Sequence, residues 1–217
     1  MYSNVLFVEG DEDRKLFLSI SRSLNFKVEV KYDPSGKGNA ILGFIAALKL
    51  QTSASKTRIG LVVDADFLQH GSGFVATQAL INQKLQAIDW NPLSLTQYSG
   101  FGTTSPKVKD VQAGVWVMPD NLSDGYVENF VIQSISASQQ PLANYAFQQT
   151  VIADFGGNGI PPIPTKPHHM DKAKVGTWLA WNDPPRMSLG AAHASHLLDF
   201  DAGLGGDLSD WLKWLYL

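Results

Sequence analysis

Alternating apolar and polar segments divide the first half of the chain into strands and helices. Short runs rich in Val and Ile predict buried strands, whereas apolar residues spaced three and four apart predict helices. Strand and helix follow one another three times, which is typical of right-handed crossovers that build a mainly parallel sheet. The predicted strands are 4–8, 27–32 and 58–63, and the predicted helices are 11–24, 40–50 and 74–88.

The second half of the chain is less regular and mostly helical. A fourth strand is predicted at 114–118, and a Gly/Pro-rich connector with four prolines spans 156–169. We expect an α/β core over 1–120 and a helical extension over 121–217 that packs on it as a C-terminal cap, in one compact unit. The predicted helices of the extension are 126–135, 142–155, 170–181, 188–198 and 208–216.

Composition excludes several classes of protein. The 217 residues are 44% hydrophobic and include no cysteine, which describes a folded globule without disulfides, thiolate zinc sites or a cysteine nucleophile. The longest apolar run is too short to span a bilayer, and residues 1–8 do not resemble a signal peptide, so we expect a cytoplasmic protein without a membrane partner.

The charge is mildly acidic overall and unevenly distributed. A net charge of −3 argues against a protein that binds nucleic acid through bulk charge alone. Residues 22–58 nevertheless contain seven basic and only two acidic side chains. A solvated surface is the commoner explanation of such a stretch, and a phosphate-binding track becomes attractive only beside an active site.

Carboxylates follow two of the predicted strands at the point where each ends. Glu9 follows the first strand, and Asp64 and Asp66 follow the third. Side chains just beyond the carboxyl ends of parallel strands line the crevice where ligands bind in open α/β sheets. On an extended chain, Asp64 and Asp66 would point to the same side, about 7 Å apart. Oxygen ligands of this kind favour Mg²⁺ or Mn²⁺; the alternative is that the acids of this region only cap helices and turns, as Asp13 would.

The segments VEGDEDRKLF (8–17) and LVVDAD (61–66) resemble the Toprim domain, and the whole chain resembles small standalone Toprim-like proteins related to OLD-type (overcoming lysogenization defect) nucleases. The resemblance implies a Toprim-like sheet and a metal-dependent nuclease. It implies that Asp64 and Asp66 hold Mg²⁺ or Mn²⁺, and that Glu9 shares the metal or acts as general acid/base. The chain is too short for the tyrosine-bearing domain of topoisomerases or the partner domain of primases, and it has no cysteine zinc site of the RecR type.

Two residues of the second half gain roles only through this resemblance. Glu128, in SDGYVENF (123–130), would help to build a second metal site, and Lys172 would stabilise charge on the phosphate during cleavage. The alternatives are a first-turn acid favoured by the helix dipole and a solvated lysine. A Gly-rich turn of Gly36, Lys37, Gly38 and Asn39 is a weaker candidate for phosphate binding at a helix N-terminus.

Other conspicuous residues do not form recognisable sites. His193 and His196 lack the usual spacing of helical zinc ligands, and we expect them on the surface. His168 and His169 lie in the connector, where nothing selects them. The tryptophans Trp178, Trp181, Trp211 and Trp214 are expected in a core or an interface.

The sequence therefore predicts a Mg²⁺-dependent nuclease that cleaves DNA or RNA, plausible as an effector of a prokaryotic defence system. A separate ABC-type ATPase is an expected partner, and a homo-oligomer is compatible with the sequence. The alternative is a Toprim-fold module that binds nucleic acid or protein without cleaving it. Three repelling carboxylates favour the nuclease, whereas the modest charge and the missing DNA-binding domain favour the module.

Overall fold

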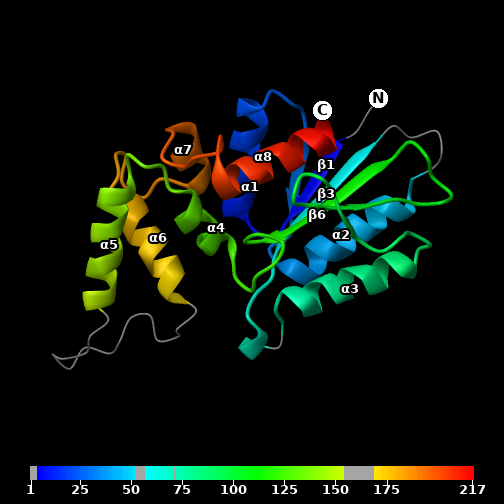
Figure 1. The fold of residues 1–217 in the computed structure, drawn as a ribbon, viewed down its shortest axis with the longest axis horizontal. Helices are drawn as coiled ribbons and strands as arrows, with labels where there is room; N and C mark the ends of the chain where they lie inside the picture. Colours follow the sequence, from blue (N-terminus) through cyan, green and yellow to red (C-terminus); the bar gives the residue numbers. More distant parts are fainter. Residues whose placement is uncertain (1–3, 52–56, 71, 154–168) are drawn as a thin grey trace.

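The structure is a computed structural model that describes residues 4–51, 57–70, 72–153 and 169–217. Strands and helices alternate up to α3, and helices predominate after β6 (Figure 1). The strands are β1 Asn4–Val8, β2 Glu29–Tyr32, β3 Arg58–Asp64, β4 Ser94–Leu95, β5 Phe101–Thr103 and β6 Gln112–Met118. The helices are α1 Asp11–Ser23, α2 Lys37–Lys49, η1 Leu68–His70, α3 Phe74–Gln86, α4 Val127–Ser134, α5 Gln140–Ala153, α6 Met170–Ala180, α7 Leu189–Ala194 and α8 Gly203–Tyr216.

One six-stranded sheet organises the molecule in the order β2-β1-β3-β6-β5-β4. The first four strands of this order are parallel, and β5 and β4 complete the sheet as an antiparallel pair. β1, β3 and β6 are apolar along nearly their whole length because helices cover both faces, as parallel sheets require. The predicted α/β class with a mainly parallel sheet is confirmed.

The helices cover the two faces of the sheet in separate groups. On one face α2 and α3 pack against alternate residues of the strands, such as Ile59 and Val115, whereas α1 and α8 cover the other face (Figure 1). Gly60 of β3 permits a close approach of α8, because a Cβ there would lie 2.5 Å from the Tyr216 hydroxyl. That hydroxyl donates a hydrogen bond to the Val5 carbonyl at 2.9 Å.

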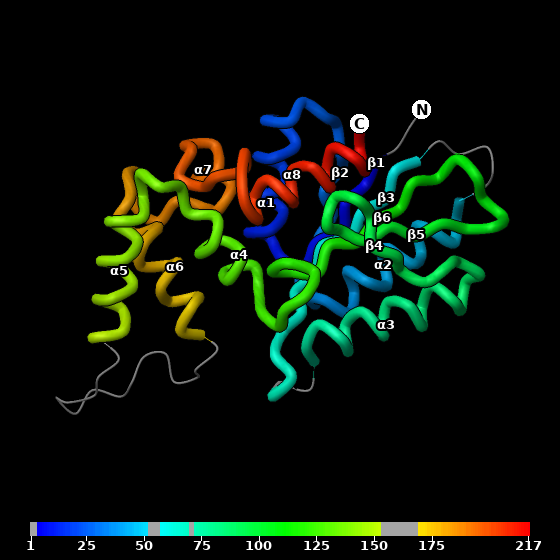
Figure 2. Tube along the Cα trace, viewed as in Figure 1, coloured from blue at the N-terminus to red at the C-terminus, as the bar shows by residue number. Residues whose placement is uncertain are grey.

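The remaining helices extend the molecule to one side of the sheet, where α5 and α6 lie next to each other (Figure 2). The chain then returns through α7 to α8, whose Trp211 and Leu215 are fully buried on the sheet. The C-terminal helix therefore caps the core as predicted. The expected boundary near residue 120 falls in the loop between β6 and α4 and stays a prediction.

Several predicted boundaries were wrong for local reasons. The hairpin β4–β5 was missed because strands of two and three residues contain no alternation to recognise. α8 begins at Gly203, five residues before the predicted start, because the glycines of its first turn have a low helix propensity. α7 ends at Ala194 rather than at residue 198. The connector 156–169 and the end of the predicted helix 142–155 lie mostly outside the described residues.

No helix in the described part of the chain combines the length and the apolarity needed to cross a bilayer.

Candidate functional site

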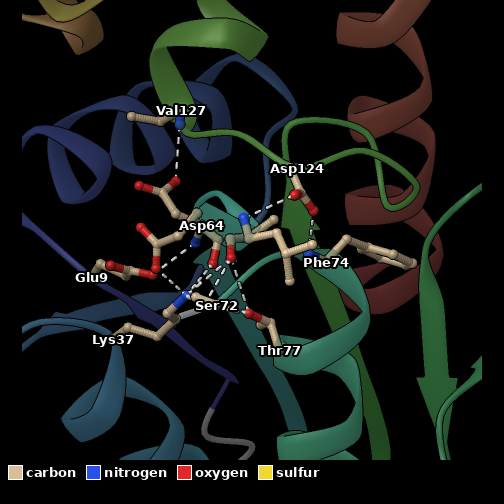
Figure 3. A network of polar contacts seen from close by, with 11 residues as sticks. Glu9, Lys37, Asp64, Ser72, Phe74, Thr77, Asp124 and Val127 are labelled. Carbon is tan, nitrogen blue, oxygen red and sulfur yellow. Dashed lines mark hydrogen bonds and ion pairs between the residues drawn. The ribbon is translucent and has the colours of Figure 1, made fainter. Parts of the chain in front are cut away.

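The adjacent strands β1 and β3 bring Glu9 and Asp64 to the same edge of the sheet. The two strands are parallel, with Phe7 opposite Leu61, so both end at the carboxyl edge of the sheet. One carboxylate oxygen of Glu9 accepts a hydrogen bond from the backbone N–H of Asp64 at 2.7 Å (Figure 3). The two residues are therefore in direct contact, although 55 positions separate them in the sequence.

Asp66 reaches this edge in a different way from the one the sequence suggested. Its φ of 62° places it in the left-handed region, so the chain is no longer extended after Asp64. Backbone hydrogen bonds of 2.9 Å in both directions pair Asp66 with Gly125. The expectation that Asp64 and Asp66 share one side of an extended strand was wrong, because this pairing turns the chain before Asp66.

The carboxylate of Asp66 forms an ion pair with the Lys37 ammonium, which is largely buried. The same ammonium donates to the Asp64 and Ala65 carbonyls, at 2.9 and 3.3 Å, and to the Ser72 hydroxyl at 3.0 Å (Figure 3). Lys37 thus fastens α2 to the loop after β3. It is already occupied by protein groups, although the sequence suggested it for phosphate.

The rest of the predicted phosphate-binding turn is the beginning of α2. The helix starts at Lys37, three residues before the predicted start, with Gly36 as its N-cap at a φ of 81°. Gly38 and Asn39 therefore belong to its first turn, and the Asn39 side chain bonds Asp33. A Cβ at Gly36 or Gly38 would meet nothing within 4 Å, so both positions have open space around them.

Three aspartates accept hydrogen bonds from backbone N–H groups at or next to helix N-termini. Asp13 accepts from Gly10 before α1 at 3.0 Å, and Asp64 accepts from Val127 of α4 at 2.9 Å. Asp124, which sequence reasoning missed, accepts from Phe74 of α3 at 2.7 Å. α1, α2, α3 and α4 each follow a parallel strand of this sheet, so their positive N-terminal ends all lie at its carboxyl edge.

Glu128 and Lys172 meet next to these aspartates. The Lys172 ammonium lies 3.9 Å from one carboxylate oxygen of Glu128 and 5.4 Å from the centre of the Tyr126 ring. The other Glu128 oxygen is buried and has no hydrogen-bond partner among the described residues. Lys172 therefore reaches this edge of the sheet from α6, and its ion pair is with Glu128 rather than with Asp64 or Asp66.

Burial and mutual repulsion raise the pKa values of these acids. Burial raises the pKa of Glu9 to about 7, and the charges of Asp66 and Asp13 add to the effect. Burial likewise raises the pKa of Asp13 to about 6, with Glu128 as the strongest repelling neighbour. The pKa values of Asp64 and Glu128 are also raised, first by burial. Glu9, Asp13, Asp64, Asp66 and Glu128 form what we term the carboxylate cluster.

The carboxylate cluster contains the oxygen ligands of a divalent-cation site, but these ligands are not grouped around one position. Within 4–51, 57–70, 72–153 and 169–217, no three Asp, Glu or His side chains are grouped closely enough to hold an ion as they stand. Each predicted ligand already contacts a protein group. Asp66 contacts Lys37, Asp64 contacts Val127 and Glu9 contacts the Asp64 N–H, whereas Glu128 has one oxygen near Lys172. The free oxygen of Glu128 and the raised pKa values nevertheless fit Mg²⁺ or Mn²⁺, because a hard cation would offset the repulsion.

Two predictions about histidine and tryptophan can be judged separately. His193 is buried rather than on the surface, because α7 packs closely on α1. The His193 ring forms a hydrogen bond of 2.9 Å with the Ser19 hydroxyl of α1. A Cβ at Gly190 would lie 2.4 Å from the Lys15 carbonyl, which shows how close the two helices are. Trp178 and Trp211 are fully buried as expected, whereas Trp181 is 44% exposed. His168 lies outside the described residues.

Comparison with known proteins places the chain in a family and leaves its chemistry open. No curated protein and no solved structure matches the chain. A family model, described as protein of unknown function (DUF3226), matches residues 3–217. Because the match covers nearly the whole chain, the protein belongs to the DUF3226 family.

Proposed function

We propose that this protein is a Mg²⁺-dependent hydrolase of phosphodiester bonds in DNA or RNA, related to the Toprim and OLD-type nucleases that its sequence resembles. The observation that carries the proposal is the carboxylate cluster, which collects acids from β1, β3, α1 and α4 at one edge of the sheet. Four helix N-termini and the Lys172 ammonium lie at the same edge. Such an arrangement attracts a divalent cation and the phosphates that accompany it.

In this proposal Asp64, Asp66, Glu9 and Glu128 hold the cation. A bound Mg²⁺ would supply charge neutralisation at the scissile phosphate and a water of lowered pKa. Because Asp66 is paired with Lys37, a cation can bind the Asp66 carboxylate only if the Lys37 ammonium moves to another acceptor. The ammonium has other acceptors within reach, since it already contacts the Asp64 and Ala65 carbonyls and the hydroxyls of Ser72 and of Thr77 in α3.

Glu9 and Lys172 have the properties that the remaining steps need. A carboxyl group with a pKa near 7 exchanges protons efficiently at neutral pH, which suits Glu9 as general acid/base. Lys172 is half exposed, and both its ion pair with Glu128 and its contact with the Tyr126 ring are long, so its ammonium is able to turn towards a phosphate oxygen. Positive charge at that position stabilises the negative charge that develops during cleavage.

A second candidate function is a module that binds nucleic acid without cleaving it. It is favoured by the engagement of Asp64 and Asp66 in protein contacts and by the absence of a ready three-ligand group among the described residues. Under this alternative, Asp13, Asp64 and Asp124 serve only as helix caps. The nuclease requires the negative charge of these carboxylates to hold a cation, whereas the binding module does not.

The predictions about partners and location extend the nuclease proposal. A separately made ABC-type ATPase would supply the energy or the regulation that a small nuclease lacks, within a prokaryotic defence system. The carboxyl edge would face a nucleic acid, and the cytoplasm is where such a substrate is found. A homo-oligomer stays compatible with this proposal.

The test is a cleavage assay on supercoiled plasmid, single-stranded DNA and tRNA, with Mg²⁺, with Mn²⁺ and with EDTA. We expect metal-dependent cleavage of at least one substrate, and its loss in Asp64→Asn, which removes the charge and keeps an oxygen for the Val127 N–H. The matched control is Asp210→Asn, which removes an exposed carboxylate on α8. Binding of the same substrates without cleavage in any metal would favour the binding module instead.

A further inference from the structure

A pocket of about 440 Å³ lies beside the carboxylate cluster. Residues of α1, α4 and α6 and the segment leading into α7 line it, so it is formed where the helical extension meets the core. Glu128 and Lys172 belong both to this lining and to the proposed nuclease site. Whatever occupies the pocket therefore reaches the proposed site directly.

The floor of this pocket is apolar. Five aliphatic or thioether side chains contribute to its lining, and none of these residues is more than 9% exposed. They come from three separate segments, which together make a surface suited to one face of a flat, weakly polar group. The floor residues are Val127, Val175, Leu179, Met187 and Leu189.

The polar part of the lining carries three cations and two acids, Glu12 and Glu128, so its net charge is +1. The cations are Lys15, Lys172 and Arg186, all more exposed than the floor residues. Lys15 pairs with Asp11 and Glu12, and Lys172 pairs with Glu128. Arg186 forms no ion pair with any residue that the structure describes, although its backbone N–H is fixed by the Leu179 carbonyl at 3.1 Å. An apolar floor with cations at the rim fits a ligand that has a ring and a phosphate.

Gly176 keeps the pocket open. It lies within α6, where glycine costs about 1 kcal/mol relative to alanine. Neither packing nor backbone geometry requires a glycine here, because a Cβ would meet nothing within 4 Å and the residue is helical. The space that a side chain would take is part of the pocket.

We infer that this pocket binds one nucleotide of the substrate strand, with the base on the apolar floor and the phosphate at the cationic rim. A volume of 440 Å³ accommodates a single nucleotide but not a base pair. Because Glu128 and Lys172 are shared, a nucleotide held here presents its phosphodiester to the carboxylate cluster. The inference rests on the proposed nuclease function and deepens it: the substrate is a single-stranded end or an unpaired nucleotide.

The experiment measures binding without catalysis, by calorimetry in EDTA, with the four nucleoside 5′-monophosphates and with inorganic phosphate. We expect the wild-type protein to bind at least one monophosphate about tenfold more tightly than inorganic phosphate, because only the nucleotide uses the floor. Gly176→Phe fills the pocket and should weaken this binding tenfold or more. The matched control is Ala46→Phe, which adds the same ring at an exposed helical position on α2.

A second variant tests the rim in case Gly176→Phe does not fold. Arg186→Gln changes an exposed side chain and should weaken monophosphate binding about threefold to tenfold. Equal binding of monophosphate and inorganic phosphate by the wild-type protein overturns the inference. Wild-type affinity in both Gly176→Phe and Arg186→Gln overturns it as well.

Cleavage measured on the same variants separates this inference from the nuclease proposal. Nucleotide binding that Gly176→Phe abolishes, in a protein that cleaves nothing with Mg²⁺ or Mn²⁺, supports the pocket and refutes the nuclease. Metal-dependent cleavage of single-stranded DNA that Gly176→Phe leaves unchanged refutes the pocket and supports the nuclease.

Discussion

The two ends of the parallel strands differ in how their polar groups are satisfied. At the amino ends, Arg58 donates to Gln112 and to the Leu215 carbonyl, and Gln112 donates in turn to the Trp214 carbonyl at 2.7 Å. At the carboxyl ends, acids crowd together, their pKa values are raised, and one oxygen of Glu128 has no partner among the described residues. The hydrogen bonds at the amino ends stabilise the fold. The crowded acids at the carboxyl ends destabilise it, as the residues of functional sites often do.

The larger of the two cavities lies at the end opposite the carboxylate cluster. The larger groove, about 810 Å³, lies at the amino ends and includes Asn4, Arg58 and Gln112, the first residues of β1, β3 and β6. Its strongest polar groups already bond the end of α8. The smaller pocket beside the carboxylate cluster has the unsatisfied charge, and unsatisfied charge is the better guide to chemistry.

Removing one negative charge from the carboxyl end should have the largest effect. Asp64→Asn should lower metal-dependent cleavage about 10³-fold or more, because the central ligand of the proposed cation loses its charge. The melting temperature should stay equal or rise, since repulsion with Glu9 and Asp13 is relieved. Cleavage rates and thermal melts of Asp64→Asn and Asp210→Asn check this; a variant that melts well below wild type would show that Asp64 is mainly structural.

Lys172 should affect turnover and leave metal binding unchanged. Lys172→Ala is expected to slow cleavage about 10²-fold, the size of losing one charge-stabilising donor. Lys172→Arg should restore part of the rate. Mn²⁺ binding followed by electron paramagnetic resonance should be the same in both variants and in the control Lys213→Ala, which breaks an exposed pair on α8. Full turnover in Lys172→Ala would return this lysine to the role of an ordinary surface residue.

At the amino ends, the comparison predicts a loss of stability with no change in chemistry. Arg58→Met removes the Nη1 donor of both hydrogen bonds and leaves the Gln112 oxygen and the Leu215 carbonyl without this partner, which should cost about 1–3 kcal/mol. For a domain of this size, each kcal/mol lowers the melting temperature by about 2–4 °C. Arg22→Met, at an exposed position on α1, should change it much less. Metal-dependent cleavage per folded molecule should be unaffected in both variants.

The last prediction is a pH dependence of stability that arises at the carboxyl end. The pKa of Glu9 is about 7 in the folded protein and near 4.5 when unfolded, so the folded state binds the extra proton between these values. The stabilisation is complete below pH 4.5 and is lost as pH rises through 7. Thermal melts in EDTA should fall over this window, and Glu9→Gln should flatten the fall. An unchanged slope in Glu9→Gln would show that other groups cause it; Mg²⁺ should raise the melting temperature most at high pH.

Much of the fold was predictable because the spacing of apolar residues along the sequence indicates which side chains are buried. β1, β3 and β6 are buried on both faces and read as continuous apolar runs, and α1 shows helical spacing of Leu16, Phe17 and Ile20. The β4–β5 pair could not be predicted, because its identity depends on pairing with β6 rather than on its own sequence. The burial of His193 depends likewise on α7 packing against α1.

The candidate site was predictable only in part. The adjacency of Glu9 and Asp64 follows from topology, since both residues end neighbouring parallel strands. The ion pair between Lys37 and Asp66 joins residues far apart in sequence and leaves no local signal. Asp124 had one signal, an Asp-Gly pair after a strand, but its partner at Phe74 lies 50 positions away. The roles of Glu9, Asp64, Asp66, Glu128 and Lys172 stay predictions.

Both edges of the sheet are poorly suited to adding a further strand. β2 has only four residues, of which Glu29 and Lys31 are exposed and charged, and β4 has two. Short or charged edge strands prevent sheets of separate molecules from joining. Exposed aromatic side chains lie instead on the helical extension, where the rings of Tyr145 in α5 and Trp181, next to α6, are tilted against each other with centres 5.7 Å apart. The fold thereby protects the molecule from aggregating through its sheet.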